Sequence, residues 1–142
     1  MQIQYSGEIA NTAAVGKQTA FTTTSTTAPV LSGIGAVVSP LNGSAVYISG
    51  SATLSNTTST DGAIMDLYYA PASSVPSAGT AVTGYTAYGL AATVTGSAVV
   101  PIDAFITGLT PGVSYVFTLG VEAVTGGTAS MILEGLKIKD TI

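Results

Sequence analysis

Apolar and polar side chains alternate along several short stretches of this chain, and the alternation predicts β-strands. The clearest example is residues 45–54, AVYISGSATL. Its apolar positions are Val46, Ile48, Ala52 and Leu54, and its polar positions are Tyr47, Ser49, Ser51 and Thr53. Successive side chains of a strand point to opposite faces of a sheet, so one face of this strand is expected to be buried.

Turn-forming residues separate such runs, as in an all-β sandwich or barrel. Asn42-Gly43 precedes the run just described and Gly126-Gly127 precedes the last one; both pairs favour tight turns. The other strand-like runs are AIMDLYYA (63–70), TAYGLAATV (86–94), SAVVPIDAFI (97–106), SYVFTLGVEAV (114–124) and ASMILEGLKI (129–138). Because no stretch combines a helical period with capping residues, the predicted fold class is all-β.

The run 114–124 is largely uncharged on both of its faces. One face carries an aromatic and aliphatic set, and the other carries Val116 and Thr118. The first set is Tyr115, Phe117, Leu119, Val121 and Ala123. A strand of this kind is expected to be covered on both sides, and the second cover is expected to be either another sheet or another copy of the protein.

The first 29 residues have a different character. They end in TAFTTTSTTAP, which is low in complexity and lacks apolar periodicity. We therefore expect an extended arm or linker over residues 1–29 and one folded domain over residues 30–142. The arm carries spaced apolar side chains, namely Ile3, Tyr5, Ile9 and Phe21. They favour an arm that becomes ordered on a partner, and the alternative is a flexible tail without a role.

Charge is scarce, and its distribution excludes some functions. Charged residues make up 7% of the 142 residues, against about 25% in ordinary globular domains. Three Lys, no Arg and seven acidic residues give a net charge of -4, so nucleic-acid binding is not expected. The chain starts without a basic and apolar signal sequence and contains no apolar run of membrane-spanning length, so neither export nor membrane insertion is expected.

The residue types that most often carry chemistry are missing. Without His and Cys, the commonest general base, the thiolate nucleophile and most transition-metal ligands are absent. A glycosidase pair would need two of the scattered acids, and no Trp is present to line a sugar cleft. Asp61 has Thr hydroxyls nearby but no D-x-D-x-D spacing for calcium. We expect no enzymatic activity, no metal and no cofactor.

One motif carries a family resemblance. Leu109, Pro111, Gly112 and Tyr115 form the pattern L-x-P-G-x-x-Y at the start of a strand. This pattern resembles the fibronectin type III turn, whose Tyr forms a tyrosine corner. It also resembles the jelly-roll heads of the tumour-necrosis-factor and C1q group, which recur in phage fibre and capsid-decoration proteins. The Gly-rich hairpin VTGGTASM and the lack of Trp favour a single jelly roll with a short N-terminal arm.

The jelly-roll resemblance implies a function. Such heads are usually trimers, which would make this chain a homotrimer. The implied trimer interface is Tyr115, Phe117, Leu119, Val121 and Tyr68. With no heptads, repeats or stalk, the chain is most similar to a non-enzymatic decoration, or cement, protein that binds the major capsid protein on the outside of a phage or virus capsid.

In that interpretation the protein is made in the host cytoplasm, becomes part of the virion exterior and stabilises the shell. The implied capsid contacts are the arm residues Ile3, Tyr5, Ile9 and Phe21. Two alternatives remain open. One is the receptor-binding tip of a phage tail fibre or spike, and the other is a fibronectin-type-III-like surface-layer or adhesin module.

Overall fold

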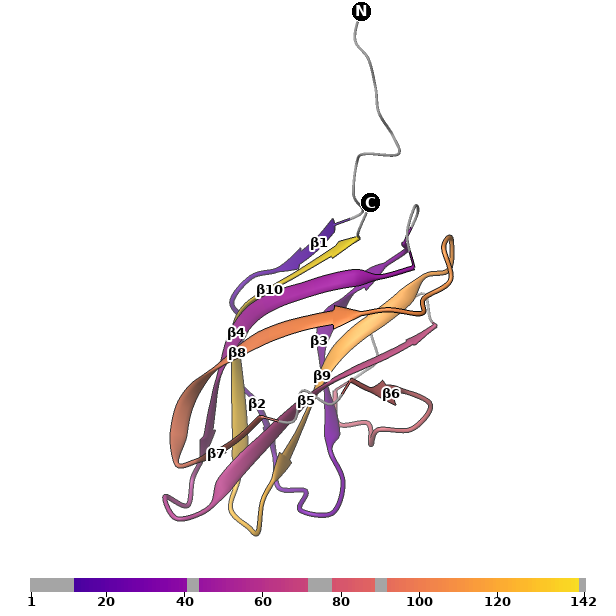
Figure 1. The fold of residues 1–142 in the computed structure, drawn as a ribbon. Helices are drawn as coiled ribbons and strands as arrows, with labels where there is room; N and C mark the ends of the chain where they lie inside the picture. The colour runs from indigo at the N-terminus through magenta and orange to yellow at the C-terminus, as the bar shows by residue number, and fades with distance from the viewer. Residues whose placement is uncertain (1–11, 41–43, 72–77, 89–91, 141–142) are drawn as a thin grey trace, which may run out of the picture.

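Two antiparallel sheets of five strands each form a β-sandwich in the computed structural model, which describes residues 12–40, 44–71, 78–88 and 92–140 (Figure 1). Sheet A has the order β1-β10-β4-β8, with β2 also paired to β10, and sheet B has the order β3-β9-β5-β6, with β7 also paired to β5. The strands of sheet A are β1 (Thr12–Val15), β2 (Phe21–Thr23), β4 (Val46–Asn56), β8 (Ser97–Ile106) and β10 (Ala129–Asp140). The strands of sheet B are β3 (Val30–Val38), β5 (Gly62–Pro71), β6 (Thr86–Ala87), β7 (Ala92–Thr95) and β9 (Tyr115–Ala123).

The connections between the strands are those of a jelly roll. The chain passes from one sheet to the other between β2 and β3, β3 and β4, and β4 and β5, and again from β7 through β8 and β9 to β10. Each inner strand consequently lies between strands that are distant in sequence: β4 lies between β10 and β8, and β9 lies between β3 and β5. The predicted all-β jelly-roll class is confirmed, and this topology differs from that of fibronectin type III.

The hydrophobic core lies between the two sheets. On β4 the alternate residues Val46, Ile48, Ala52 and Leu54 are buried, as the sequence pattern predicted. On β9 the facing residue Phe117 is fully buried, and the ring of Tyr69 stacks on it with 5.9 Å between ring centroids. Each large side chain buried in this way contributes roughly 1.5–3 kcal/mol to folding.

The opposite face of β9 is also covered within the single chain. Val116 and Thr118 have no exposed surface, and Thr118 Oγ1 donates a hydrogen bond of 3.0 Å to the carbonyl oxygen of Ile34. Farther along the strand, the Tyr68 ring lies on Gly120: a Cβ added to this glycine would be 2.6 Å from Tyr68 Cε2. Tyr68 therefore occupies the space that a side chain at position 120 would need, and β9 needs no second copy of the protein as a cover.

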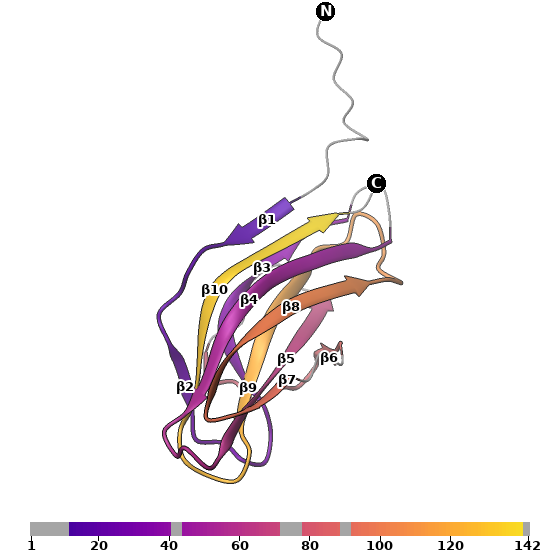
Figure 2. The same cartoon turned by 60° about the vertical axis from the view of Figure 1, so that its left-hand side comes forward.

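The N-terminal segment is a strand of the sandwich from Thr12 onward. β1 pairs with the C-terminal half of β10, where Thr12 lies opposite Lys139. β2 pairs with the N-terminal end of β10, where Phe21 lies opposite Met131. Figure 2 shows β1 and β2 following β10 along one edge of sheet A. The expected boundary at residue 30 thus falls inside the sandwich, and the extended arm is corrected to an interrupted edge strand for residues 12–23.

The physical reason lies in the inward side chains of this segment. Ala13, Val15 and Phe21 are partly buried against the core, and Thr12, Thr22 and Thr23 of the two strands are β-branched and suit a strand. The low apolar content of an edge strand with one solvated face resembles that of a linker. Residues 1–11, which include Ile3, Tyr5 and Ile9, lie outside the described residues.

Candidate functional site

The residues predicted to form a trimer interface lie inside one chain. Tyr115, Phe117, Leu119 and Val121 point into the core between the sheets, so they are not available to a second copy. Tyr68 lies on the outer face of sheet B but is only 6% exposed. The prediction of which residues share a face was right, but the apolar face of β9 packs on sheet A of its own chain. This assignment of the trimer interface is therefore corrected.

Of the predicted capsid contacts, the described part of the chain contains Phe21. It is half-buried in β2 and packs against the core, so its role in the sandwich is structural. The other three, Ile3, Tyr5 and Ile9, fall in the stretch that is not described, and their contact with a capsid stays a prediction.

The exposed aromatic side chains gather on sheet A, which the sequence analysis did not single out. Tyr47 on β4 is 42% exposed and Phe105 on β8 is 53% exposed, and the two residues are direct cross-strand partners. Tyr88 is also exposed, and its hydroxyl lies against the backbone of Phe105. We call Tyr47, Tyr88 and Phe105 the aromatic patch. The exposed Val99 lies farther along the same outward face of β8, where it is 67% exposed.

The free edge of β8 is closed at two positions. The Tyr88 hydroxyl accepts a hydrogen bond of 3.2 Å from Phe105 N and donates one of 3.4 Å to Phe105 O. The backbone groups of Phe105 therefore point away from β4, and those of Asp103 and Pro101 point the same way because the direction alternates along a strand. Pro101 has no N–H to offer. A neighbouring strand would accordingly find an interrupted set of partners along β8.

Charge is distributed unevenly across the outer face of sheet A. The strand register places Lys139, Tyr47 and Phe105 in one row across β10, β4 and β8. The next row is Lys137, Ser49 and Asp103. Both lysines are exposed, as is Asp103. In these two rows β10 is therefore basic and β8 is acidic, with the aromatic patch beside the acid, while Glu134 farther along β10 is paired with Lys17.

Tyr47 and Asp103 are electrostatically linked. A hydrogen bond between the Tyr47 hydroxyl and the Asp103 carboxylate raises the pKa of Tyr47, and the negative charge of Asp103 and partial burial raise it further. The neutral phenol thus remains the donor at physiological pH. Tyr47 and Asp103 lie on the neighbouring strands β4 and β8, one row apart on the same outward face.

The buried carboxylate of Asp61 has a structural role at the opposite end of the sandwich. It is 6% exposed, and its Oδ1 accepts hydrogen bonds from Gly62 N at 2.7 Å and Thr125 N at 2.9 Å. Burial alone would raise its pKa, but these N–H donors, the Thr125 side chain and Gly126 N outweigh it and lower the pKa. The Asp61 carboxylate therefore connects the β4–β5 turn to the β9–β10 turn through hydrogen bonds.

Asn56 strengthens the same connection. Its Nδ2 donates to the carbonyl oxygens of Gly62 at 2.8 Å and Gly126 at 2.9 Å, and its Oδ1 accepts from Thr58 N at 2.9 Å.

Within the described ranges, no three His, Cys, Asp or Glu side chains gather in a way that could hold a metal ion. The same residues contain no helix long and apolar enough to cross a membrane.

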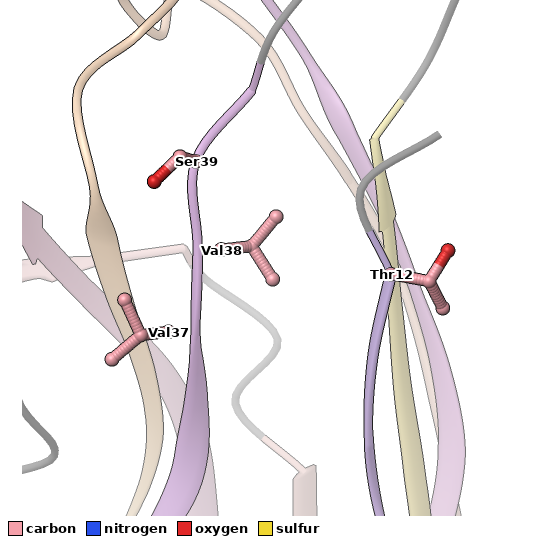
Figure 3. A pocket seen from close by; sticks show the side chains of 4 residues that line it. All are labelled: Thr12, Val37, Val38 and Ser39. Atoms are coloured by element: carbon pink, nitrogen blue, oxygen red, sulfur yellow. The ribbon is translucent and has the colours of Figure 1, made fainter. Parts of the chain in front are cut away.

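A hollow of about 180 Å³ lies between the edge strands β1 and β3, lined by Thr12, Val37, Val38 and Ser39. Figure 3 shows Val38 pointing toward β1, while the Thr12 side chain points away from β3 and Val37 and Ser39 point to the other side of their strand. The Ser39 hydroxyl is 2.6 Å from that of Ser114. None of the four lining residues is ionisable, so the hollow offers no acid, base or charged ligand group.

The described residues form a protein of the all-β class, a jelly-roll β-sandwich that exposes an aromatic patch on sheet A. No protein-family model matches the chain, and no curated protein matches it in sequence. Solved structures of infectious bursal disease virus do share the fold. The VP2 subviral particle aligns over 94% of this chain with a TM-score of 0.58 and 14% identity. VP2 in derived T=1 particles, from a mutant, gives a TM-score of 0.59 with 12% identity over 94% of this chain.

The Gx strain of the same virus aligns over 94% of this chain with a TM-score of 0.55 and 16% identity. In these matches the chain spans about a third of the viral protein, 33% for the subviral particle and 32% for the T=1 particles. Identities this low show a common fold. The chain is thus a jelly roll similar to a domain of a protein found in virus particles.

Proposed function

We propose that this protein is a non-enzymatic structural protein of a virion, a homotrimer that binds the major capsid protein on the outside of the shell. The observation that carries the proposal is the jelly-roll similarity to VP2 of virus particles, which extends over 94% of the chain.

The arrangement of the polar groups supports a structural role. The buried carboxylate of Asp61, in the β4–β5 turn, accepts hydrogen bonds from the backbone N–H groups of Gly62 and Thr125. Lys17 forms an ion pair with Glu134, with 3.4 Å between Nζ and Oε2, at the exposed surface. These groups hold turns and strands together, and none of them has the adjacent base that a nucleophile requires.

Shell stabilisation would follow from mass action. A protein that binds the assembled shell but not free subunits lowers the free energy of the shell by RT ln(1 + [L]/Kd) for each site, about 2.7 kcal/mol when its free concentration is a hundred times Kd. Three chains joined in one trimer would bind neighbouring capsid subunits together and raise the effective affinity. The apolar residues Ile3, Tyr5 and Ile9 are the proposed capsid contacts, because a few apolar anchors commonly dominate an interface.

The test is co-sedimentation with capsid shells that lack the decoration protein. The wild-type chain should saturate the shells and raise their disruption temperature. A variant with Ile3, Tyr5 and Ile9 all changed to Ser should sediment at least about tenfold less, while its own melting temperature stays the same. A matched control is Val124→Ser, which removes an exposed apolar side chain from the β9–β10 turn.

Binding of the wild-type chain to host cells but not to shells would contradict the proposal and favour the fibre-tip alternative. That alternative keeps the fold and has one observation in its favour, the exposed aromatic patch, since exposed aromatic rings are common in binding sites. Equal sedimentation of wild type and the triple Ser variant would place the capsid contact elsewhere on the surface.

A further inference from the structure

We propose that the outer face of sheet A is the surface through which copies of this chain contact one another, head to tail, around the three-fold axis of the proposed homotrimer. The inference rests on the proposed trimeric state and replaces the buried β9 residues as its interface. The contacting residues would be Tyr47, Asp103 and Phe105 of one copy and Lys137 and Lys139 of the next.

The first argument is that this face exposes two neighbouring aromatic rings, whereas several other large rings of the described residues are buried. Phe117 and Tyr115 of β9 are in the core, and Tyr68 is covered on sheet B. Tyr47 and Phe105 are left side by side on the outside of sheet A as cross-strand partners. Adjacent exposed aromatic side chains are typical of the buried centre of an interface, where Tyr is enriched.

Charge complementarity identifies a second copy as the occupant. The two exposed lysines of β10 lie in the same rows as Asp103 and Phe105 of β8, two strands away, with only the short edge strand β1 beyond them. When the β8 side of one copy meets the β10 side of the next, Lys137 approaches Asp103 and Lys139 approaches the Phe105 ring. Lys137 and Asp103 then form an ion pair, and Lys139 and Phe105 form a cation–π contact in the next row. Both contacts can form together because the two residues on each strand are the same two positions apart.

The two sides of the face differ, so a contact between them is heterologous. Heterologous contacts make a closed ring when the rotation between copies closes, and three copies is the number proposed here. The closed edge of β8 favours this arrangement over a continuous sheet. Pro101 lacks an N–H, and the Tyr88 hydroxyl is hydrogen-bonded to the backbone N–H and carbonyl oxygen of Phe105. β8 is therefore a poor partner for an added strand. Copies would therefore meet through side chains.

Charge reversal tests the pairing directly. Light scattering at micromolar concentration should give three chain masses for the wild type. Asp103→Lys and, in a separate variant, Lys137→Glu should each weaken the trimer by about tenfold or more in the dissociation constant. A chain that carries both Asp103→Lys and Lys137→Glu should recover the trimer, because the exchanged charges attract again. Glu122→Lys, the same kind of charge change on sheet B, is the control and should leave the mass unchanged.

Removal of the ring gives a second, independent measurement. Phe105→Ser should dissociate the trimer into folded monomers, whereas Val124→Ser should not; circular dichroism verifies that both remain folded. The inference is overturned if the wild type is a monomer or dimer, if the variant with both Asp103→Lys and Lys137→Glu fails to recover, or if Phe105→Ser keeps the three-chain mass.

Shell co-sedimentation separates this inference from the proposed function. If Phe105→Ser stays trimeric and loses shell binding, the face binds the capsid protein and the inference fails while the function stands. If the charge variants behave as expected but the wild-type trimer does not bind shells, the interface stands and the capsid role fails.

Discussion

The backbone N–H of Thr110 donates a hydrogen bond of 2.9 Å to the hydroxyl oxygen of Tyr115, five positions later in the chain. This contact fastens the L-x-P-G-x-x-Y turn onto the start of β9 and has the form of a tyrosine corner. The ring of Tyr115 is buried while its hydroxyl reaches back to the turn. One side chain thus connects the core with the loop between β8 and β9.

Tyr115→Phe should lower the free energy of unfolding by about 1 kcal/mol, the usual net contribution of one hydrogen bond. The loss stays modest because Thr110 is exposed and its N–H can bind water instead. Urea denaturation checks the value. Tyr69→Phe, which removes a hydroxyl from the ring stacked on Phe117, is the matched control. An equal loss in both variants would argue against a specific role for the corner.

Asp61 should make the protein sensitive to acid. Its pKa in the folded state is lowered below the ordinary value of 3.8, so its stabilising contribution is complete above that value and is lost as the pH falls through the folded pKa. Unfolding measured between pH 6 and pH 2 should show the wild type losing stability in this range. Asp61→Asn should be less stable at neutral pH and should lose less on acidification. Parallel curves for the two proteins would exclude Asp61 as the cause.

Deletion of residues 1–23 should destabilise the domain by at least about 2 kcal/mol, since it removes the partners of β10 and the partly buried Phe21. Thermal unfolding followed by circular dichroism is a suitable measurement. Deletion of residues 1–11 leaves β1 and β2 in place and serves as the control, with a melting temperature close to that of the full chain. An unchanged melting temperature after the longer deletion would show that β10 does not need its edge partner.

Gly35→Ala should cost about 3 kcal/mol of stability or prevent folding, because the new Cβ would overlap the carbonyl oxygen of Phe117 on the neighbouring strand. The overlap involves backbone, which cannot move aside as a flexible side chain can. Gly16→Ala is the control: no heavy atom lies within 4 Å of where its Cβ would be. Similar stabilities of the two variants in urea would contradict the close approach of β3 to β9.

The sequence pattern predicted the strands well and their partners poorly. The run 97–106 matches β8 at both ends, and β4 buries the predicted face, because a two-residue period depends only on local geometry. The run 86–94 became two short strands, β6 and β7. Strand pairing is set by contacts between distant parts of the chain, which alternation does not encode.

The surface was harder to predict than the core for a related reason. Phe117 and Phe105 both lie in strand-like runs rich in apolar residues, yet one is fully buried and the other is 53% exposed. The difference arises from position in the sandwich: β9 is an inner strand, and Phe105 points outward from the edge strand β8. The edge strand formed by β1 and β2 was missed because its Thr-rich sequence resembles a linker.

The position of β10 between β4 and the N-terminal strands affects how the protein can fold as it is made. Thr12 pairs with Lys139, so the first described strand can pair only after the last one has been synthesised. Until synthesis has passed Asp140, β4 lacks one neighbour and β1 and β2 lack their only one in sheet A. Pairing between such distant segments is slow. Until then the edge of β4 that pairs with β10 is left without its backbone partner. An unpaired strand edge favours aggregation, so this is a stage at which the nascent chain would benefit from chaperones.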